Sequence, residues 1–501
     1  MSTLTALARA QAFSEGRAVP IATVRHVHLS DEPLVLVPLL LAGEAAAPLA
    51  ALVGTARERP ELLVVEQPRN RDQRFAFLAA LAEIVVGYID RRRADTETVE
   101  PTRNREAWAR YLDAPQIIVP NGGGIEALRL FGRSSRFRSP QGPYPVGPRV
   151  PVLGRYLTWI AEDRAPMPGS SVCLALTDVL SAHWASGQSA LEDQHLATLV
   201  GWIAPPPGLT GAQAAALAED PERCPPAGPT TDPHFDATIL SPLIVRQQNA
   251  AGDPAAERAA ESALREALLS QLQPTWDTVW RGIDLLRELP AAAHDEHRWM
   301  VDRGRFTEFA RLLDEGAPPQ PRRDGAVAAA KRLSDLEAAQ ESYDKQRALD
   351  DPLVLAQYRV TGEAFAGRVV AVDAERQDTS GRSPKPRPRV WIRTEDPVVL
   401  RPGVKVACPQ RPVQRPIVIG AVPDGDGYLV ELELVDGMGR KAVPEEGSVP
   451  EPGEYRCYAT VLAAEWFAPP PLPEPAATPW THGGAPPAYM PTDADHDEEW
   501  H

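Results

Sequence analysis

Short apolar runs alternate with amphipathic segments in the first part of the chain. The apolar runs are bounded by turn-forming residues, as buried strands are, and cover residues 34–41, 62–66 and 116–119. The amphipathic segments have apolar positions near helical spacing and cover residues 45–53, 72–93 and 125–131. This alternation predicts a small α/β domain over residues 1–139.

Helical patterns dominate the middle of the chain, where proline-rich loops separate them. Two long segments, residues 254–289 and 293–315, carry apolar side chains at helical spacing. One side of the first segment has the composition of a packed core, with Trp276, Val279, Trp280, Ile283 and Leu286. We predict a mixed, mainly helical domain over residues 140–317, followed by a linker and helix over residues 318–352.

The pattern becomes strand-like after residue 352. Six short β-rich segments separated by turn signals predict a small antiparallel β-barrel over residues 353–467. The Gly367-Arg368-Val369-Val370 opening and the Pro402-Gly403 turn resemble the small β-barrel accessory domains of superfamily 1 helicases. Because the motor motifs of those helicases do not occur in this sequence, the resemblance implies a helicase-like ATPase as a separate partner.

The last segment, residues 468–501, is rich in proline, contains no Lys or Arg and ends in a cluster of acidic residues. This composition predicts a disordered tail. Trp480, Tyr489 and Trp500 are isolated aromatic residues within it, an arrangement that suits a peptide docking on a protein partner. The alternative is a tail that only improves solubility. Together, the four patterns predict an α+β multidomain protein.

Composition excludes several classes of chemistry. The first lysine is Lys331, so residues 1–330 cannot contain a phosphate-binding loop ending in Gly-Lys-Ser/Thr or a Schiff-base lysine. The preference for Arg, Ala and Pro is typical of a GC-rich bacterial genome. The four cysteines are far apart, without a CxxC pair for zinc or redox chemistry, and we expect them to be reduced thiols of a cytoplasmic protein.

Membrane insertion and general coating of nucleic acid are also disfavoured. The longest apolar run, residues 34–42, is far shorter than the roughly 20 residues needed to span a bilayer. The net charge of −16 opposes binding of nucleic acid over the whole surface. Residues 1–150 nevertheless contain 19 arginines and 16 acidic residues, so local basic patches remain available for such binding.

One candidate binding segment combines a glycine loop with arginines. Three consecutive glycines lie between a predicted strand and a predicted helix, where free backbone N–H groups can bind a phosphate, and four arginines and two phenylalanines follow them. These residues are Gly122, Gly123, Gly124, Arg129, Phe131, Arg133, Arg136, Phe137 and Arg138. The glycines match neither the dinucleotide fingerprint nor the Walker loop. The alternative is a turn followed by an exposed arginine-rich face.

A second basic segment lies in the predicted barrel. Arg382, Lys385, Arg387 and Arg389 are interleaved with prolines, which would keep a loop extended and its charges apart. Such a loop can contact a phosphate backbone or an acidic protein surface, and the alternative is a solvated loop.

We expect no metal or cofactor. His294-Asp295-Glu296-His297 is the densest cluster of possible metal ligands, but no third ligand is identifiable and the HExxH order is absent. There is no Gly-x-Ser-x-Gly nucleophile motif. The absence of these motifs favours a protein without catalytic activity.

We therefore predict a non-catalytic accessory or adaptor subunit of a cytoplasmic bacterial assembly, with a nucleic-acid-processing ATPase as a candidate partner. The arginine segments would contact RNA, DNA or an acidic protein surface. The competing hypothesis is a lysine-independent enzyme of the N-terminal α/β domain that acts on a phosphorylated or nucleotide substrate. Its site would combine the loop 121–124 with a metal held by carboxylates such as Glu44, Glu66 or Asp72, near predicted strand ends.

Overall fold

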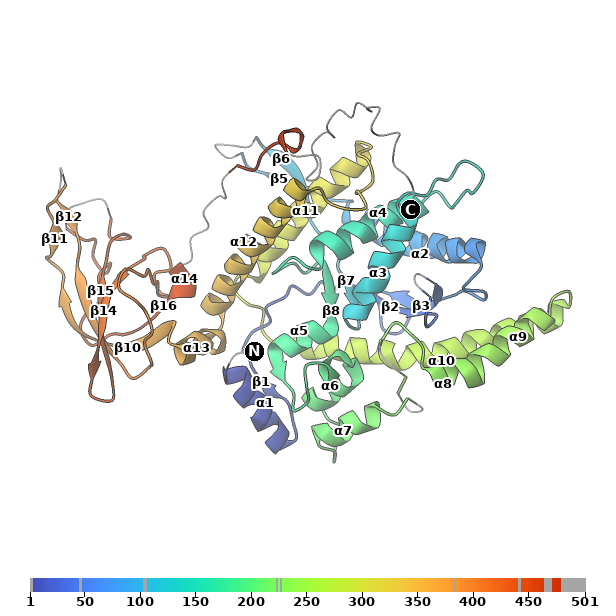
Figure 1. Cartoon of the computed structure of the whole chain (residues 1–501), viewed down its shortest axis with the longest axis horizontal. Helices are drawn as coiled ribbons and strands as arrows, with labels where there is room; N and C mark the ends of the chain where they lie inside the picture. Colours follow the sequence, from blue (N-terminus) through green and yellow to red (C-terminus); the bar gives the residue numbers. More distant parts are fainter. Residues whose placement is uncertain are drawn as a thin grey trace, which may run out of the picture.

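The apolar runs of the first half of the chain form a central five-stranded sheet in this computed structural model (Figure 1). Its order is β4-β3-β2-β7-β8, with β2 (Leu34–Leu40), β3 (Pro48–Gly54), β4 (Glu61–Val64), β7 (Ile117–Val119) and β8 (Cys173–Ala175). β2, β7 and β8 are parallel, whereas β3 is antiparallel to both of its neighbours. The parallel strands are buried along their whole length, which explains their continuous apolar character.

The structure describes residues 3–44, 47–101, 106–221, 224–225, 228–381, 384–439, 443–463 and 471–478. Trp480, Tyr489 and Trp500 lie outside these residues, and the described part of the predicted tail is residues 471–478, with a 3-10 turn at Pro475–Ala477. The described chain contains both helices and sheets, which confirms a mixed α+β protein. None of its described helices combines the length and apolar character that a bilayer crossing requires.

Helices cover both faces of the central sheet and form two cores. One face packs against α2 (Arg71–Arg92), α3 (Gly122–Ser135), α4 (Val150–Thr158) and α11 (Asp295–Asp314). The other face packs against α5 (Leu176–His183), α6 (Leu196–Ile203) and α10 (Pro254–Arg287). Because successive side chains of a strand point to opposite faces of the sheet, β2 contributes to both cores. Leu34 and Leu36 lie in the first core, and Val35 and Val37 lie in the second.

The remaining elements of the body are short or peripheral. They are α1 (Thr3–Glu15), β1 (Val19–Pro20), β5 (Thr96–Val99), β6 (Trp108–Tyr111), a π-helical turn (Trp159–Arg164), β9 (Trp184–Ala185), a 3-10 turn (Glu192–Gln194), α7 (Gly211–Ala218), α8 (Pro233–Phe235), a second π-helical turn (Asp236–Leu240) and α9 (Ser241–Asn249).

Most long helices of the sequence analysis are present, but one predicted helix is wrong. Residues 45–53 have the composition of a helix, and the chain instead forms β3 there. Ala50, Ala51 and Leu52 are completely buried between the neighbouring strands β2 and β4. Pairing on both sides and burial outweigh the helix propensity of alanine, which is small for each residue.

The C-terminal strands form a five-stranded antiparallel sheet with the order β14-β15-β13-β10-β16. These strands are β10 (Ala364–Asp373), β13 (Arg389–Thr394), β14 (Ile417–Asp424), β15 (Gly427–Glu433) and β16 (Tyr455–Ala459), accompanied by β11 (Gln377–Asp378), β12 (Lys385–Pro386) and α14 (Thr460–Ala463). Antiparallel pairing is confirmed.

The predicted closure of this sheet into a barrel is wrong. The expected strand at residues 404–406 makes only isolated bridges, from Lys405 to Ile417 of β14 and from Ala407 to Ala459 of β16. Prolines recur around it, and a proline has no N–H with which to extend a ladder. The two outer strands are therefore not joined by a continuous ladder.

Two helices connect the body to the C-terminal sheet, α12 (Ala326–Asp350) and α13 (Pro352–Thr361). Asp351, which lies between them, is completely buried. Its carboxylate accepts hydrogen bonds from Leu353 N of α13 and from Thr23 N, Thr23 Oγ1 and His26 Nε2 of the body. One carboxylate thus caps α13 and holds its first turn against the body.

Candidate nucleic-acid interface

The predicted glycine loop is the first turn of α3, directly after β7. Asn121 caps this turn, and its side chain accepts a hydrogen bond from Gly124 N at 3.3 Å. A Cβ atom at Gly124 would lie 2.6 Å from Val119 Cβ, and one at Gly123 would lie 2.6 Å from Pro229 Cδ. The glycines therefore allow the strand and the Pro229 segment to pack closely against the start of the helix.

Two of the four predicted arginines make ion pairs on the surface of the body. Arg129 pairs with Glu126 in the same helix, at 2.9 Å. Arg133 Nε lies 2.5 Å from Glu162 Oε1, and about half of its side chain is exposed. Because exposed pairs contribute little to stability, both guanidinium groups can exchange partners at low cost.

Arg136 is a structural residue, with an exposed fraction of 3%. It donates hydrogen bonds to the backbone oxygens of Gln320 and Pro321, at 3.1 and 3.0 Å. Burial lowers the pKa of its guanidinium from the ordinary value. The Phe137 ring lies between cations, with Arg136 at 5.0 Å and Arg322 at 5.8 Å from its centroid. Arg136 therefore holds the segment before α12 at the end of α3 and brings Arg322 to the same place.

The structure adds residues from the start of α2 that the sequence analysis missed. Arg71 lies 4.7 Å from the centroid of the Phe75 ring and 5.5 Å from that of Tyr144. Arg138 lies 5.2 Å from the Phe75 centroid, so this ring also has two cations beside it. In the sequence, these residues are visible only as an Arg-x-x-Arg-Phe motif at the start of a predicted helix, residues 71–75. Folding places this motif beside Arg138.

Two adjoining cavities of about 290 and 460 Å³ result from this arrangement. They share Ser134 and Arg138. We call this region the arginine surface and define it as Arg71, Arg74, Phe75, Arg133, Arg136, Phe137, Arg138, Tyr144 and Arg322. In the described part of the chain, no acidic residue lines either cavity and no carboxylate pairs with Arg74, Arg138 or Arg322.

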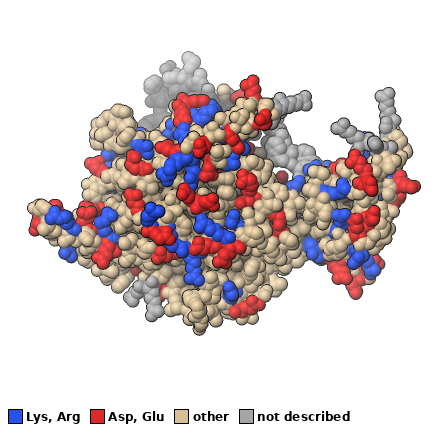
Figure 2. Space-filling model, turned by 180° about the vertical axis from the view of Figure 1, so that it is seen from behind, with Lys and Arg blue, Asp and Glu red and all other residues tan. Residues whose placement is uncertain are grey.

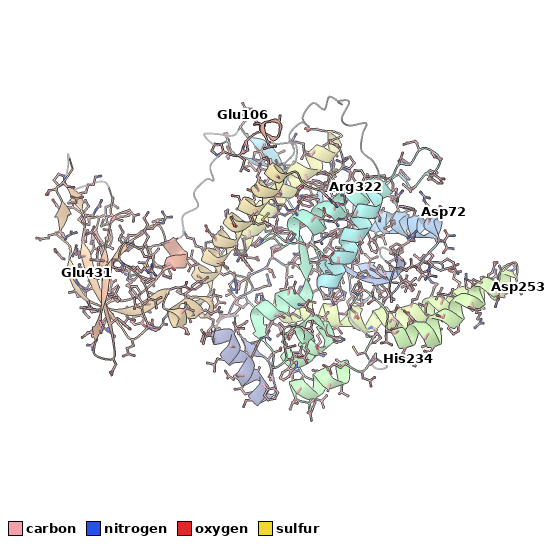
Figure 3. All side chains as sticks on the ribbon, in the orientation of Figure 1. Asp72, Glu106, His234, Asp253, Arg322 and Glu431 are labelled. Atoms are coloured by element: carbon pink, nitrogen blue, oxygen red, sulfur yellow. The ribbon has the colours of Figure 1, made fainter. Side chains whose placement is uncertain are left out.

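The second predicted basic segment is engaged within the C-terminal sheet. Arg389 is paired with Glu431 and lies 3.6 Å from Glu433. Arg387 donates to the backbone oxygens of Pro386 and Val435, both at 3.0 Å. Lys385 is exposed on β12, and Arg382 lies outside the described residues. Figure 3 shows Glu431 in the C-terminal sheet and Arg322 in the body, well apart from each other, so folding does not unite the two basic segments.

The carboxylates proposed for the enzyme hypothesis each have a different partner. Glu44 pairs with Arg69 at 2.7 Å, Asp72 pairs with Arg71 at 2.8 Å, and Glu66 accepts a hydrogen bond from Gln247 at 2.6 Å. Across the described residues, no group of three or more His, Cys, Asp or Glu side chains could hold a metal ion. His294 contacts Asp350 instead, with Nδ1 2.5 Å from Oδ1.

Charge over the rest of the molecule is mixed. Basic and acidic side chains are interspersed on the face shown in Figure 2. Because no continuous basic surface covers this face, nucleic acid would have to bind at a local site such as the arginine surface. Comparison of the chain with protein-family models, curated proteins and solved structures found no match.

Proposed function

We propose that this protein is a non-catalytic accessory subunit of a cytoplasmic assembly and that its arginine surface binds single-stranded nucleic acid. The observation that carries this proposal is the pair of adjoining cavities lined by arginines and aromatic rings, without an acidic residue among the described ones. A nucleic-acid-processing ATPase is the proposed partner of the assembly.

The chemistry of the surface suits a phosphate backbone with unpaired bases. A guanidinium group donates two parallel hydrogen bonds to a phosphate, and Arg74, Arg138 and Arg322 have no described carboxylate that would compete. The rings of Phe75 and Phe137 offer faces on which bases stack, each flanked by cations. A duplex would hide its bases from these rings, so the arrangement favours a single strand.

The same composition argues for binding rather than catalysis. The side chains that line the two cavities are arginine, phenylalanine, leucine, proline and serine. Such a set provides no carboxylate or histidine for general acid or base work, and Ser134 Oγ donates to Phe131 O instead of to a base.

The C-terminal sheet supports the accessory role. It exposes apolar side chains that a protein partner can cover, among them Val370, Val422 and Tyr455. These residues, together with the predicted docking tail, are the proposed contacts with the protein partner. The link to the body passes through α12 and α13, which places the proposed partner and the nucleic acid on separate parts of the molecule.

A triple substitution of Arg74, Arg138 and Arg322 by alanine should weaken binding of single-stranded DNA or RNA at least tenfold, about 1.4 kcal/mol. Because three phosphate contacts are lost, the slope of log K against log salt should fall by about 2. Fluorescence anisotropy with a labelled oligonucleotide at several salt concentrations measures both quantities.

The matched control removes three exposed arginines elsewhere, with Arg246, Arg258 and Arg401 replaced by alanine. Both variants change the net charge equally, so the control should retain the affinity and salt slope of the wild type. Equal losses in the two variants, or no binding by the wild type at low salt, would refute the proposed function.

A further inference from the structure

A separate cavity, of about 760 Å³, lies between the π-helical turn at Trp159–Arg164, α11 and α12. Among the described residues of α12, only Ala348 is fully buried, although the helix has 25 residues. Small side chains of α12 line part of the cavity, at Ala328, Ala338, Ala339 and Ser342, beside larger ones such as Tyr343. Together they leave a space between the helix and the body. We call this space the α12 groove.

Arg164 lines the α12 groove with its hydrogen-bonding capacity unused. Its exposed fraction is 6%, and its Nε has no hydrogen-bond partner among the described residues. The carboxylate in contact with it is that of Asp302, 3.5 Å from Nη2. A guanidinium group carries five N–H donors, and buried charged groups are normally both paired and hydrogen-bonded. Arg164 thus has at least one buried N–H group without an acceptor among the described residues.

Asp302 contacts Arg164 only at 3.5 Å, because other donors hold its carboxylate. Oδ1 accepts from Ser170 Oγ at 2.8 Å, and Oδ2 accepts from Ser171 N at 2.7 Å. These bonds orient the carboxylate toward the 170–171 loop and leave a single long contact to Arg164. Because Arg164 lines the groove, an acceptor bound there can reach its remaining N–H groups.

A stacked pair of aromatic rings lines the same groove as this guanidinium. The rings of Trp159 and Phe309 stack with their centroids 4.9 Å apart and an interplanar angle of 6°, and both residues line the groove. Charges of both signs line the groove in equal number, with Arg164, Arg298, Arg305, Lys331 and Arg332 against Asp163, Asp302, Glu308, Asp324 and Asp335. Among them, Arg164 combines deep burial with an unused N–H group, and aromatic rings line the same groove.

We infer that the α12 groove binds a small aromatic anion, whose carboxylate or phosphate group is held by Arg164 and whose ring lies along Trp159 and Phe309. This inference does not depend on the proposed function, because the groove and the arginine surface share no lining residue. Since α12 forms one side of the groove, an occupied groove also holds α12 more firmly to the body.

The probes for this site are phenylacetate, phenyl phosphate, phenylacetamide and inorganic phosphate, titrated by calorimetry into the full-length protein. Phenylacetamide retains the ring and removes the charge, whereas inorganic phosphate retains the charge and removes the ring. At least one aromatic anion should bind saturably and about tenfold more tightly than either control. Comparison of phenylacetate with phenyl phosphate identifies the anionic group that is preferred.

Two substitutions on α12 test the location without touching Arg164. Ala339→Trp places a large side chain in the groove, whereas Glu337→Trp places it on an exposed position of the same helix. The first variant should lose binding of the preferred anion at least tenfold, and the second should retain it. Arg164→Lys, which keeps the charge but not the planar donor array, should weaken binding of the anion and leave that of phenylacetamide unchanged.

Two results would overturn the inference. One is the absence of saturable binding by both aromatic anions at millimolar concentration. The other is a wild-type affinity in Ala339→Trp, which would place any binding elsewhere. Neither result affects the oligonucleotide titration of the arginine surface.

Discussion

Asp351→Asn should lower the free energy of unfolding by about 3–5 kcal/mol, because it removes a buried charge from a site built of donors. Both carboxylate oxygens of Asp351 accept two hydrogen bonds, from Thr23 N and His26 Nε2 on one side and from Thr23 Oγ1 and Leu353 N on the other. An amide group in either orientation places its N–H₂ against two of these donors. Urea unfolding followed by circular dichroism measures the loss.

The effect of Asp351→Asn should depend on pH. Burial by itself raises the pKa of Asp351, but hydrogen bonds from His26, Thr23 and Leu353 outweigh burial and hold this pKa below its ordinary value. The stability that a carboxylate with a lowered pKa contributes is present above its unfolded pKa of about 3.9 and is lost as the pH falls through the folded pKa. The difference between wild type and variant should be constant from pH 7 to 5 and shrink below about pH 4.

The matched control for this prediction is Asp335→Asn, an exposed carboxylate in α12. It should change the free energy of unfolding by less than about 0.5 kcal/mol. If both variants lost the same free energy of unfolding at every pH, Asp351 would not have the proposed role of holding α13 against the body.

Gly154→Ala should destabilise the protein by about 2–3 kcal/mol, although alanine favours a helix. A Cβ atom at Gly154 in α4 would lie 2.3 Å from Arg136 N and 2.7 Å from Arg136 Cα. These are backbone atoms, so α3 and α4 would have to separate. Arg136 would move with α3 and release the segment that carries Arg322, so affinity for single-stranded nucleic acid should fall as well.

Gly87→Ala is the matched control, since Gly87 lies within α2 and a Cβ atom there meets nothing within 4 Å. It should stabilise the protein by up to about 1 kcal/mol through reduced chain entropy. Thermal unfolding should show a lower melting temperature for Gly154→Ala and an unchanged or higher one for Gly87→Ala. Similar stabilisation by the two substitutions would show that α3 and α4 are not in such close contact.

The candidate site was partly accessible from the sequence. The segment 129–138 was identified as an arginine-rich, aromatic-containing face, and three of its four arginines, Arg133, Arg136 and Arg138, line the cavities. Its other half lies about 60 residues earlier and nearly 200 residues later in the chain, at Arg71 and Arg322. No local pattern connects such distant positions. The burial of Arg136 could not be predicted from the sequence either, because its acceptors are the backbone oxygens of Gln320 and Pro321, far along the chain.

The sequence by itself determined the elements whose signal is local periodicity. The apolar stripes of α2, α10 and α11 and the apolar runs of β2 and β7 are visible in it, because burial of one side imposes a regular spacing. Only the tertiary structure decided the strand at 48–54, the open C-terminal sheet, the arginine surface and the unsatisfied Arg164. In each of these, the outcome depends on partners distant in sequence, which compete successfully with weak local propensity.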